Sequence, residues 1–401
     1  MSLFRFEGVI PASKSHFNRA LICASYGNGI KLIGQSSCED VLKMQEAFTG
    51  LDQKTTFDCG SAGTVLRFLA LRVSRIPGEH ILRGTERLFS RPTEDLRDIL
   101  SQLGVKMVLQ SDHMILSSQS GWKPKNNSIK VNREKSSQFA SGILLNAWDL
   151  DFPLRIEWDK PGVSQGYWQM SVQVVKDFGM RLNQDESGVE ISAHSKTNIN
   201  EYQVESDVSS TFAIAAHAAL NGQATFKKFP FDTLQPDIAF TQILEKLGVG
   251  VEKKSTELQI YQKNLTGQVN LKGIHANLNE CPDLFPVLAT LCAFAKGNSM
   301  LDGAPHLIFK ESNRIQKTAE LLHRMGVKTK ILTDGMEIHP PEILVMPQVA
   351  FEYDTDHDHR LAFAASLLAS QNYPIRILHP EVVNKSFPEF WNFLEKAKSV
   401  Y

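Results

Sequence analysis

A pattern of amphipathic helix, glycine and short alternating strand recurs along the chain, and it constrains the fold more than any other feature. The glycines are Gly50, Gly104, Gly179, Gly248 and Gly326. Glycine suits the left-handed position that ends a helix, and the alternation that follows indicates a half-buried strand. Spacings of roughly 50 to 80 residues exceed those of a solenoid and predict an α/β chain in which one unit of helices and strands is used about six times. The alternative is chance recurrence, since such segments occur in any α/β protein.

The length and charge of the chain limit its function. A chain of 401 residues is too long for one hydrophobic core, so we expect two domains. Its 43 basic and 44 acidic residues give a net charge of -1, which provides no general attraction to nucleic acid or to an anionic membrane. Any anion site must therefore be built locally.

The N-terminus, the apolar stretches and the cysteines indicate the class of protein. The N-terminal sequence does not read as a signal peptide, and the longest apolar stretches fall short of the ~20 residues that span a bilayer. The five cysteines are never paired as C-x-x-C, which predicts neither a zinc cluster nor a disulfide framework. We expect a soluble, cytoplasmic protein with reduced cysteines.

Four segments place small or polar side chains at the start of an expected helix, where N–H groups and the helix dipole favour an anion. Each is also explained by helix capping, a tight turn or solvated surface charge. The glycine-rich segment matches neither the P-loop nor the dinucleotide-binding motif. The segments are PASKSHFNRAL with Lys14, Ser15 and Arg19, DCGSAGTVLRFLA with residues 60–64, SRPTEDL with Arg91, and REKSSQFASGILL with Ser136, Ser137 and Gln138.

Two further segments place carboxylates where they can act in acid/base chemistry. Asp283, in NECPDLFPVLATLCAFAKG, precedes a nearly all-apolar helix, where burial can raise the pKa of a carboxyl into the range of a general base. In HLIFKESNRI, Lys310 and Arg314 are spaced to share a helix face with Glu311 alongside. Helix capping and a solvated helix face are the alternatives.

The heptapeptide DTDHDHR, residues 354–360, packs three carboxylates, two imidazoles and a guanidinium into seven residues. Such a set is compatible with a metal site, an acid/base centre or one wall of an anion pocket. The later segment NKSFPEF adds Lys385.

Nine motifs follow one another in the order found in 5-enolpyruvylshikimate-3-phosphate synthases, and the chain resembles this family from about Pro11 to Phe390. They are PASKSHFNRAL, CGSAGTVLRFL, SRPTEDL, SSQF, SDVSS, PDLFPVLATLCAFAKG, FKESNRI, DHDHRLAF and NKSFPEF. The resemblance implies transfer of the enolpyruvyl group of phosphoenolpyruvate to the 5-hydroxyl of shikimate 3-phosphate, with release of phosphate. Addition is followed by elimination through a tetrahedral intermediate, without metal or organic cofactor. We expect a monomer that binds small molecules, with no nucleic acid or membrane partner. The resemblance also implies that the inhibitor glyphosate competes with phosphoenolpyruvate, although these motifs do not predict how strongly it inhibits.

The resemblance also assigns roles to single residues. Asp283 matches the base that takes the 5-hydroxyl proton, Glu311 matches the acid that exchanges protons with the methylene carbon, and Lys14 matches a lysine that touches both substrates. The residues expected to bind shikimate 3-phosphate are Lys14, Ser15, Arg19, Ser136, Ser137, Gln138, Ser164, Tyr167, Asp283, His306 and Lys310. Those expected to bind phosphoenolpyruvate are Lys14, Gly63, Arg91, Gln138, Arg314, Arg360 and Lys385, with Thr64, Arg67 and His359 near the pocket.

For the heptapeptide, the resemblance favours the anion pocket over a metal site. Its last three residues match the family's D-H-R, with Arg360 aimed at the carboxylate of phosphoenolpyruvate. Asp354 and Asp356 are then expected at a turn or on the surface, and His357 receives no role.

The family fold consists of two globular domains, each with three βαβαββ units, in an arrangement called an inside-out α/β barrel. The resemblance places residues 1–12 and 206–401 in the first domain and residues 13–205 in the second. The active site is expected in the cleft between the domains.

Four residues depart from the family motifs. Phe17 replaces a small residue, Ser61 an asparagine, Asn313 an aspartate, and His306 stands where many relatives have asparagine. Three alternatives therefore accompany the expected activity: a UDP-N-acetylglucosamine enolpyruvyl transferase, a non-catalytic anion-binding protein that kept the pocket, and a metal-dependent hydrolase built on DTDHDHR. Against the first alternative, this chain has no clear counterpart of the reactive-cysteine loop common in the UDP-sugar family. Against the second, the acid, base and phosphate ligands expected from the resemblance are retained.

Overall fold

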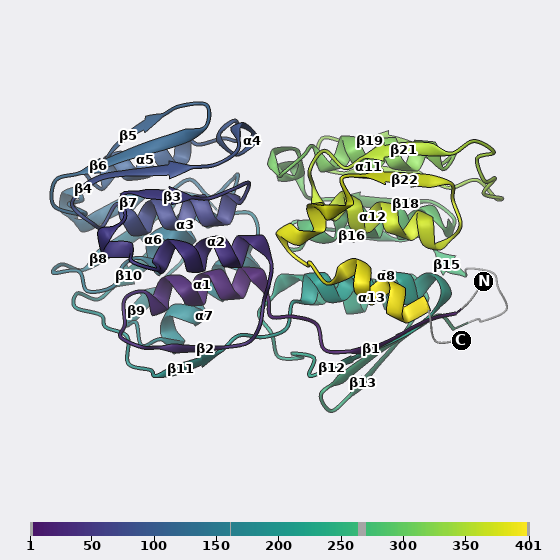
Figure 1. Cartoon of the computed structure of the whole chain (residues 1–401), viewed down its shortest axis with the longest axis horizontal. Coiled ribbons are helices and arrows are strands. Elements are labelled where there is room, and N and C mark those ends of the chain that lie inside the picture. Colours follow the sequence, from purple (N-terminus) through teal and green to yellow (C-terminus); the bar gives the residue numbers. More distant parts are fainter. Residues whose placement is uncertain (1–2, 161, 264–269, 399–401) are drawn as a thin grey trace. The chain divides into compact units, whose positions relative to one another are not determined.

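The computed structural model describes residues 3–160, 162–263 and 270–398, which form two compact units (Figure 1). Unit 1 comprises Met1–Pro11 and Ser206–Tyr401, and unit 2 comprises Ala12–Glu205. Each unit has a hydrophobic core of its own. The N-terminal segment therefore packs with the C-terminal half of the chain rather than with the residues that follow it.

Unit 2 contains two four-stranded sheets, with strand orders β3-β4-β6-β5 and β7-β8-β10-β9, and the pair β11-β2. Its helices are α1 (Lys14–Ala24), α2 (Glu39–Phe48), α3 (Gly63–Val73), α4 (Glu86–Phe89), α5 (Glu94–Gln102), α6 (Gln138–Leu145) and α7 (Gln165–Asp177). Its strands are β2 (Lys31–Ile33), β3 (Thr56–Asp58), β4 (Gly78–Arg83), β5 (Lys106–Leu109), β6 (His113–Ser118), β7 (Ser128–Lys130), β8 (Leu154–Glu157), β9 (Leu182–Gln184), β10 (Gly188–Ile191) and β11 (Glu201–Gln203).

Unit 1 also contains two four-stranded sheets, β1-β12-β14-β13 and β16-β18-β20-β19, and the pairs β15-β17 and β21-β22. Its helices are α8 (Val208–Asn221), α9 (Phe240–Lys246), α10 (Phe285–Ala293), α11 (Arg314–Arg324), α12 (His359–Ser370) and α13 (Phe390–Lys398), with 3₁₀ turns η3 (Pro236–Ala239), η4 (Pro282–Leu284), η5 (Pro305–Phe309) and η6 (Pro380–Lys385). Its strands are β1 (Phe4–Gly8), β12 (Gly222–Lys227), β13 (Gly250–Lys254), β14 (Glu257–Tyr261), β15 (Leu271–Lys272), β16 (His275–Asn277), β17 (Ala295–Lys296), β18 (Ser299–Asp302), β19 (Lys328–Ile331), β20 (Met336–His339), β21 (Phe351–Asp354) and β22 (Ile375–Leu378).

All four four-stranded sheets have one topology. Each begins with two parallel strands and ends with an antiparallel pair made by the next two strands of the chain. Parallel neighbours need a crossover, whereas antiparallel neighbours need only a short turn. The crossover contains one helix of the same unit in each sheet, and between β1 and β12 it also contains the whole of unit 2. The predicted α/β fold with a repeated βαβαββ unit is therefore confirmed. The other two of the six expected repeats form no four-stranded sheet in the described residues. Only the parallel pairs β11-β2 and β21-β22 represent them there.

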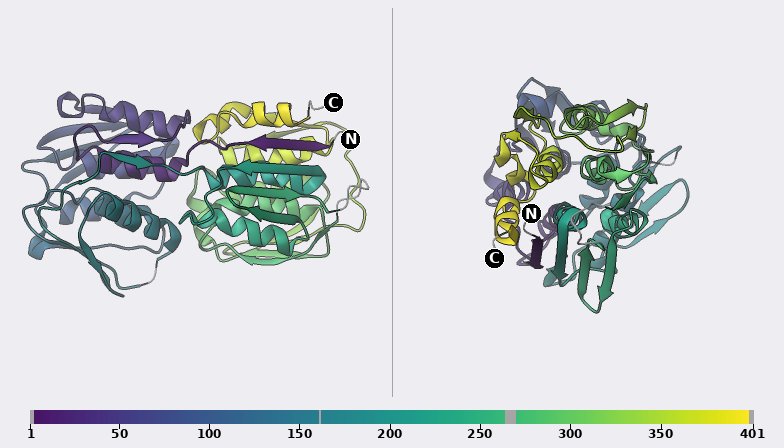
Figure 2. Two further views of the ribbon diagram at one scale, coloured as in Figure 1. Left: turned by 90° about the horizontal axis from the view of Figure 1, so that it is seen from below. Right: turned by 90° about the vertical axis from the view of Figure 1, so that its right-hand side faces the viewer.

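Strand β1 supplies the first strand of its sheet from the opposite end of the sequence. It pairs in parallel with β12, from Phe4 opposite Gly222 to Gly8 opposite Phe226, and the two lie side by side in Figure 2. A Cβ atom on Gly222 would lie 1.9 Å from the carbonyl oxygen of Phe4. Only glycine allows this close approach, and its φ of 146° also disfavours other residues.

The five helix-ending glycines behave as predicted. Their φ angles are 70°, 77°, 104°, 94° and 79° in chain order, all in the left-handed range. A strand follows directly after four of them, whereas Gly50 is followed by the 3₁₀ turn Leu51–Gln53 before β3. The helix-glycine-strand pattern therefore reflects a repeated βαβαββ segment rather than chance recurrence.

The central helices of each unit are buried on nearly all sides. Every residue of α10 is buried, as is α12 from His359 to Leu368, and the two helices pack against each other and against α8. In unit 2, α3 packs on α6 and α1, and α6 packs on α7. A helix that is apolar all round is buried in the core, and in α10 and α12 any charged side chains lie at the ends. The polar residues that precede these helices are thereby held at the edge of the core.

Candidate active site

Arg314 is the centre of the polar cluster in unit 1. It is the first residue of α11, its side chain is 1% exposed, and it contacts three carboxylates. Its Nη1 lies 2.7 Å from Asp283, its Nη2 lies 3.0 Å from Glu311, and its Nε lies 2.7 Å from Asp358. Burial opposes the charge of Arg314, but the three carboxylates outweigh this effect and raise its pKa. The predicted acid and the predicted base are thus held on one guanidinium.

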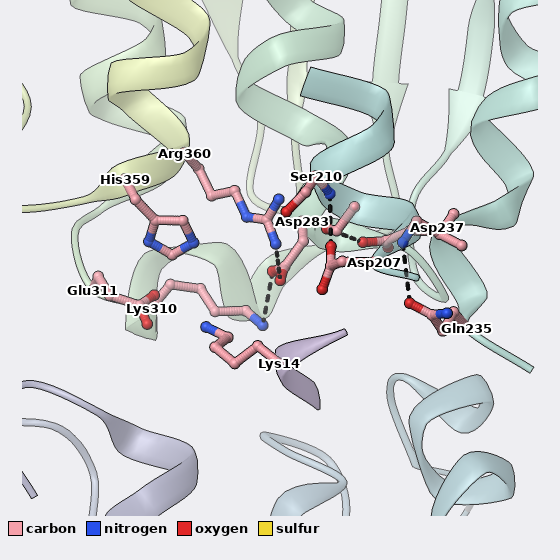
Figure 3. Close-up of polar contacts among 12 residues, drawn as sticks. Lys14, Asp207, Ser210, Gln235, Asp237, Asp283, Lys310, Glu311, His359 and Arg360 are labelled. Carbon is pink, nitrogen blue, oxygen red and sulfur yellow. Dashed lines mark hydrogen bonds and ion pairs between the residues drawn. The ribbon is translucent and has the colours of Figure 1, made fainter. Parts of the chain in front are cut away.

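Asp283 lies in η4, directly before α10, and faces two more cations. Lys310 Nζ lies 3.5 Å from its Oδ1, and Arg360 Nη2 lies 3.3 Å from its Oδ2, as Figure 3 shows. Burial alone would raise the pKa of Asp283, but attraction to Lys310, Arg314 and Arg360 exceeds that effect and holds it well below the usual value. The expectation of a raised pKa was therefore wrong, because the cations lie on elements that sequence reasoning did not place beside Asp283.

Asp358 belongs to this cluster but was not among the predicted site residues. It is fully buried and caps α12 by accepting the backbone N–H of Arg360 at 2.9 Å. It also accepts the Ser312 hydroxyl at 3.0 Å, in addition to Arg314. The heptapeptide therefore divides at this residue, because Asp354 is exposed at the end of β21 whereas the D-H-R triplet is buried. In the described residues, no three or more His, Cys, Asp or Glu side chains are grouped to hold a metal ion.

Asp237, in η3, is a second carboxyl that sequence reasoning missed. It is 1% exposed and accepts the hydroxyl of Ser209 from α8. Burial, followed by repulsion from Asp283, raises the pKa of Asp237 to about 6, with Arg360 opposing the shift. The quoted motif SDVSS was a signal for this region, since Ser209 belongs to it. Nothing local to LQPDIAF indicated that Asp237 would be buried.

The remaining predicted residues of unit 1 are also buried. His306, in η5, is 4% exposed, and burial followed by the charge of Lys310 lowers its pKa to about 3, so its ring is neutral near pH 7. Lys385, at the end of η6, is 2% exposed, and His359 is 1% exposed. A buried neutral imidazole can donate or accept a hydrogen bond, as the asparagine expected at position 306 would.

Lys14 begins α1 in unit 2 and pairs with an acid that sequence reasoning also missed. Its Nζ lies 3.1 Å from Oδ2 of Asp40 on α2, and the two side chains are 13% and 4% exposed. Ser13 caps the helix by accepting the N–H of His16. The helix start thus fixes the backbone of Lys14, and Asp40 holds its charged end.

Arg19, predicted as a ligand, ties two helices of unit 2 together. Its Nε donates to the Ser171 hydroxyl at 2.7 Å, and its Nη1 and Nη2 donate to the carbonyls of Ser15 and Tyr167 at 2.7 and 3.1 Å. Burial lowers the pKa of Arg19 to about 10, so it keeps its charge at neutral pH. In this arrangement it positions two other predicted residues, Ser15 and Tyr167.

Two residues of α3 orient the side-chain amide of Gln138, which begins α6. Its Oε1 accepts from Arg67 Nη1 at 2.7 Å, and its Nε2 donates to the Thr64 hydroxyl at 3.0 Å. Its backbone N–H donates to the Ser136 hydroxyl at 3.2 Å, while Ser137, the cap residue, makes no side-chain cap hydrogen bond. This network brings together residues that were predicted from separate segments.

Two other predicted positions depend on local backbone geometry. A Cβ atom on Gly63 would lie 2.8 Å from Arg91 Nη1, so the missing side chain makes room for the guanidinium. Ser164 caps α7 in the left-handed conformation, with φ of 55°. The position of Arg91 therefore depends on a glycine at residue 63, and Ser164 itself adopts a backbone conformation that is uncommon for residues other than glycine.

Three of the four departures from the family motifs have a structural explanation. Asn313 caps α11 by accepting the N–H of Gln316 at 3.1 Å, a task that asparagine performs as well as aspartate. Phe17 is 4% exposed and belongs to the core of unit 2. His306 is the buried neutral ring described above. Nothing in the structure explains Ser61.

These features define an α/β protein of two repeat-built units whose buried helices begin at clusters of charged and hydroxyl groups. The family model for EPSP synthase (3-phosphoshikimate 1-carboxyvinyltransferase) matches residues 52–394. The chain belongs to the EPSP synthase family.

Curated relatives with the same name are similar to this chain over almost their whole length. The 3-phosphoshikimate 1-carboxyvinyltransferase of Thermococcus kodakarensis is 31% identical over 96% of this chain and 96% of that protein. That of Methanococcus maripaludis strain C6 is 29% identical over 99% of this chain and 96% of that protein.

Solved structures support the fold. EPSP synthase from Acinetobacter baumannii has a TM-score of 0.76 at 22% identity and covers 99% of this chain and 96% of its own. The enolpyruvyl transferase NikO from Streptomyces tendae has a TM-score of 0.74 at 16% identity, with 99% and 95% covered. At these identities the likeness concerns the fold alone. None of the helices in the described part of the chain is long and apolar enough to cross a membrane.

Proposed function

We propose that the chain transfers the enolpyruvyl group of phosphoenolpyruvate to the 5-hydroxyl of shikimate 3-phosphate, giving 5-enolpyruvylshikimate 3-phosphate and phosphate. Membership of the EPSP synthase family supports the reaction. The observation that carries the residue roles is the attachment of Asp283 and Glu311 to one buried guanidinium, that of Arg314. Such a cluster supplies two proton-transfer groups and a cationic environment for anionic substrates.

In the addition step, Asp283 accepts the proton of the 5-hydroxyl while that oxygen bonds to C2 of phosphoenolpyruvate. Glu311, in its protonated form, gives a proton to the methylene carbon C3, so that C3 becomes a methyl group. In the elimination step, Glu311 removes a proton from that methyl group, the bond between C2 and the phosphate oxygen breaks, and phosphate leaves. The proton taken from the hydroxyl departs with phosphate, so Asp283 and Glu311 return to their starting states.

The strength of the base is set by its cations. In the free protein, Lys310, Arg314 and Arg360 hold the pKa of Asp283 low, which makes it a weak base. The carboxylate and phosphate groups of the substrates compete for the same cations. As they draw Arg360 and Lys310 toward themselves, Asp283 loses stabilising charge and its pKa rises. Substrate binding thereby generates the base that the reaction needs.

Unit 2 supplies the complementary ligands. Ser136, Ser137 and the N-terminus of α6 suit the phosphate of shikimate 3-phosphate, because hydroxyls and helix N–H groups bind phosphate oxygens. Arg91 and Lys14 suit phosphoenolpyruvate. We place the active site between the domains 1–12 plus 206–401 and 13–205, with closure driven by anions that bind cations of both. The proposed enzyme acts as a cytoplasmic monomer without a cofactor.

Phosphate release from phosphoenolpyruvate tests the reaction. It should occur with shikimate 3-phosphate and not with UDP-N-acetylglucosamine as the acceptor. Turnover only with the UDP sugar would refute the proposal, and binding of shikimate 3-phosphate without turnover would favour the non-catalytic alternative.

Deuterium exchange in D₂O tests the role of Glu311. The parent should incorporate solvent deuterium into the vinyl group of the product, and Glu311→Gln should lose both exchange and turnover. The matched control is Glu320→Gln on α11, the helix that begins three residues after Glu311; the Glu320 side chain is 45% exposed and pairs with Lys317 at 2.9 Å. Equal exchange in the two variants would remove Glu311 from the mechanism.

A further inference from the structure

Two exposed histidines that the proposed reaction does not use face each other in unit 1. The rings of His357 and His379 have centroids 5.2 Å apart, with planes tilted by 32°. His357 lies in the loop after β21, and His379 directly follows β22. These strands are parallel neighbours, with Asp354 opposite Leu378. Both loops therefore leave the same edge of the same sheet, and the pairing of the rings follows from the fold.

The separation of the rings suits shared coordination of a metal ion. Imidazole nitrogens bind Zn²⁺ at about 2.0–2.1 Å, which places the centres of two rings on one tetrahedral ion roughly 5 Å apart. Late first-row ions such as Zn²⁺, Cu²⁺ and Ni²⁺ favour imidazole, whereas Mg²⁺ and Ca²⁺ favour oxygen ligands. The distance and the ligand type thus indicate the same class of ion.

Glu381 contributes a second feature of such sites. Its Oε1 lies 3.4 Å from Nδ1 of His379. Histidines that bind metal ions usually give their other ring N–H to a carboxylate, which fixes the tautomer and orients the ring. Here that arrangement leaves Nε2 of His379 for the ion. The exposed carboxylate of Asp354, at the end of β21, adds negative charge at the same sheet edge.

The backbone at both histidines adopts an uncommon conformation. The φ angles of His357 and His379 are 56° and 54°, and that of the preceding residue Asp356 is 49°. Residues other than glycine rarely adopt left-handed angles, although Asp and His do so more readily than most. The backbone of the two loops therefore fixes the directions in which the two side chains leave the chain.

We propose that His357 and His379 form a two-histidine site for a late first-row divalent metal ion. In the described residues no third His, Cys, Asp or Glu side chain completes the group, so water fills the other positions and the ion exchanges readily. The site adjoins functional elements, since Asp358 directly follows His357 and η6, which begins after His379, ends at Lys385. A bound ion would tie together the loops that carry these two groups. This proposal is independent of the proposed reaction.

Zinc titration of the full chain against a chromogenic chelator tests the site. The parent should bind one equivalent of Zn²⁺, and His357→Asn and His379→Asn should each bind it at least tenfold more weakly. Asparagine tolerates the left-handed conformation, so both variants keep the loop geometry. The matched control is His275→Asn, which removes an exposed histidine that pairs with Asp302 at 2.7 Å in another sheet, and it should bind like the parent.

Electron paramagnetic resonance identifies the ligands directly. With one equivalent of Cu²⁺, the parent should show hyperfine structure from two nitrogen ligands, and either asparagine variant of the pair should show one. The proposal is overturned if the parent and both variants bind Zn²⁺ equally well, or if Mg²⁺ binds the parent as tightly as Zn²⁺ does.

Discussion

Asp358→Asn is expected to destabilise unit 1 through loss of a buried charge. The carboxylate of Asp358 is fully buried and accepts two hydrogen bonds from Arg314, at 2.7 and 3.2 Å. Asparagine keeps the size of the side chain and the helix cap, but it removes the charge and can turn an NH₂ group toward the guanidinium. Breaking a buried ion pair costs about 3–5 kcal/mol. Because Arg314 retains Asp283 and Glu311, we expect the lower end, ~3 kcal/mol.

Thermal and urea denaturation followed by circular dichroism measure this cost. For a unit of about 200 residues, ~3 kcal/mol corresponds to a fall in Tm of roughly 6–12 °C. The matched control is Asp354→Asn, the same substitution at an exposed residue of the same heptapeptide, which should change stability by less than about 0.5 kcal/mol. If the Tm values of the two variants differ by less than about 1 °C, the buried pair does not stabilise unit 1 and the reasoning fails.

Three further predictions follow from the same contacts. Asp283→Asn should lower kcat by roughly 10²–10⁴-fold with shikimate 3-phosphate binding still measurable by calorimetry, because the amide cannot accept the hydroxyl proton; near-normal turnover would remove the base assignment. Gly63→Ala should raise the KM for phosphoenolpyruvate about tenfold, ~1.4 kcal/mol, because its Cβ would displace Arg91; steady-state kinetics with an unchanged KM would contradict this. Because the folded state holds the Asp237 proton up to about pH 6, the parent binds more protons folded than unfolded between about pH 4 and 6, and its stability there falls as pH rises. Relative to Asp237→Asn, urea melts of the parent should lose on the order of 2–3 kcal/mol from pH 4 to pH 7, and a difference that does not vary with pH would count against the buried carboxyl.

The repeated unit could be predicted from the sequence because its signals are local. A helix that ends at a left-handed glycine and continues as an alternating strand needs only neighbouring residues, and all five predicted glycines have positive φ. The starts of two site helices were equally local, since Lys14 and Gln138 each begin a helix. The helix face predicted for Lys310 and Arg314 was wrong, because α11 begins only at Arg314 and Lys310 follows the 3₁₀ turn η5 with an extended backbone. The strand β1 could not be assigned to its sheet in this way, because its partner β12 lies more than 200 residues later.

The electrostatics of the site could not be predicted from the sequence because they depend on distant residues. The contacts that hold the pKa of Asp283 low include Arg314 and Arg360, which are 31 and 77 residues away along the chain. Sequence reasoning considered only the apolar helix beside Asp283, and it therefore obtained a shift of the wrong sign. Asp237 and Asp40 escaped notice for the same reason, since their partners come from other elements.

The near-zero net charge and the local cations of this protein have a common explanation in these pairs. Lys14 is held by Asp40, and Arg314 and Arg360 are held by Asp283, so the cations expected to bind substrate are already compensated in the free protein. An anionic substrate gains only the difference between its own contacts and those that it replaces, which limits affinity. The replaced contact is not lost, however, because a carboxylate released from its cation becomes a stronger base. In the mechanism that we propose, part of the binding energy of the substrates would thus be converted into reactivity at Asp283, the group proposed to accept the proton.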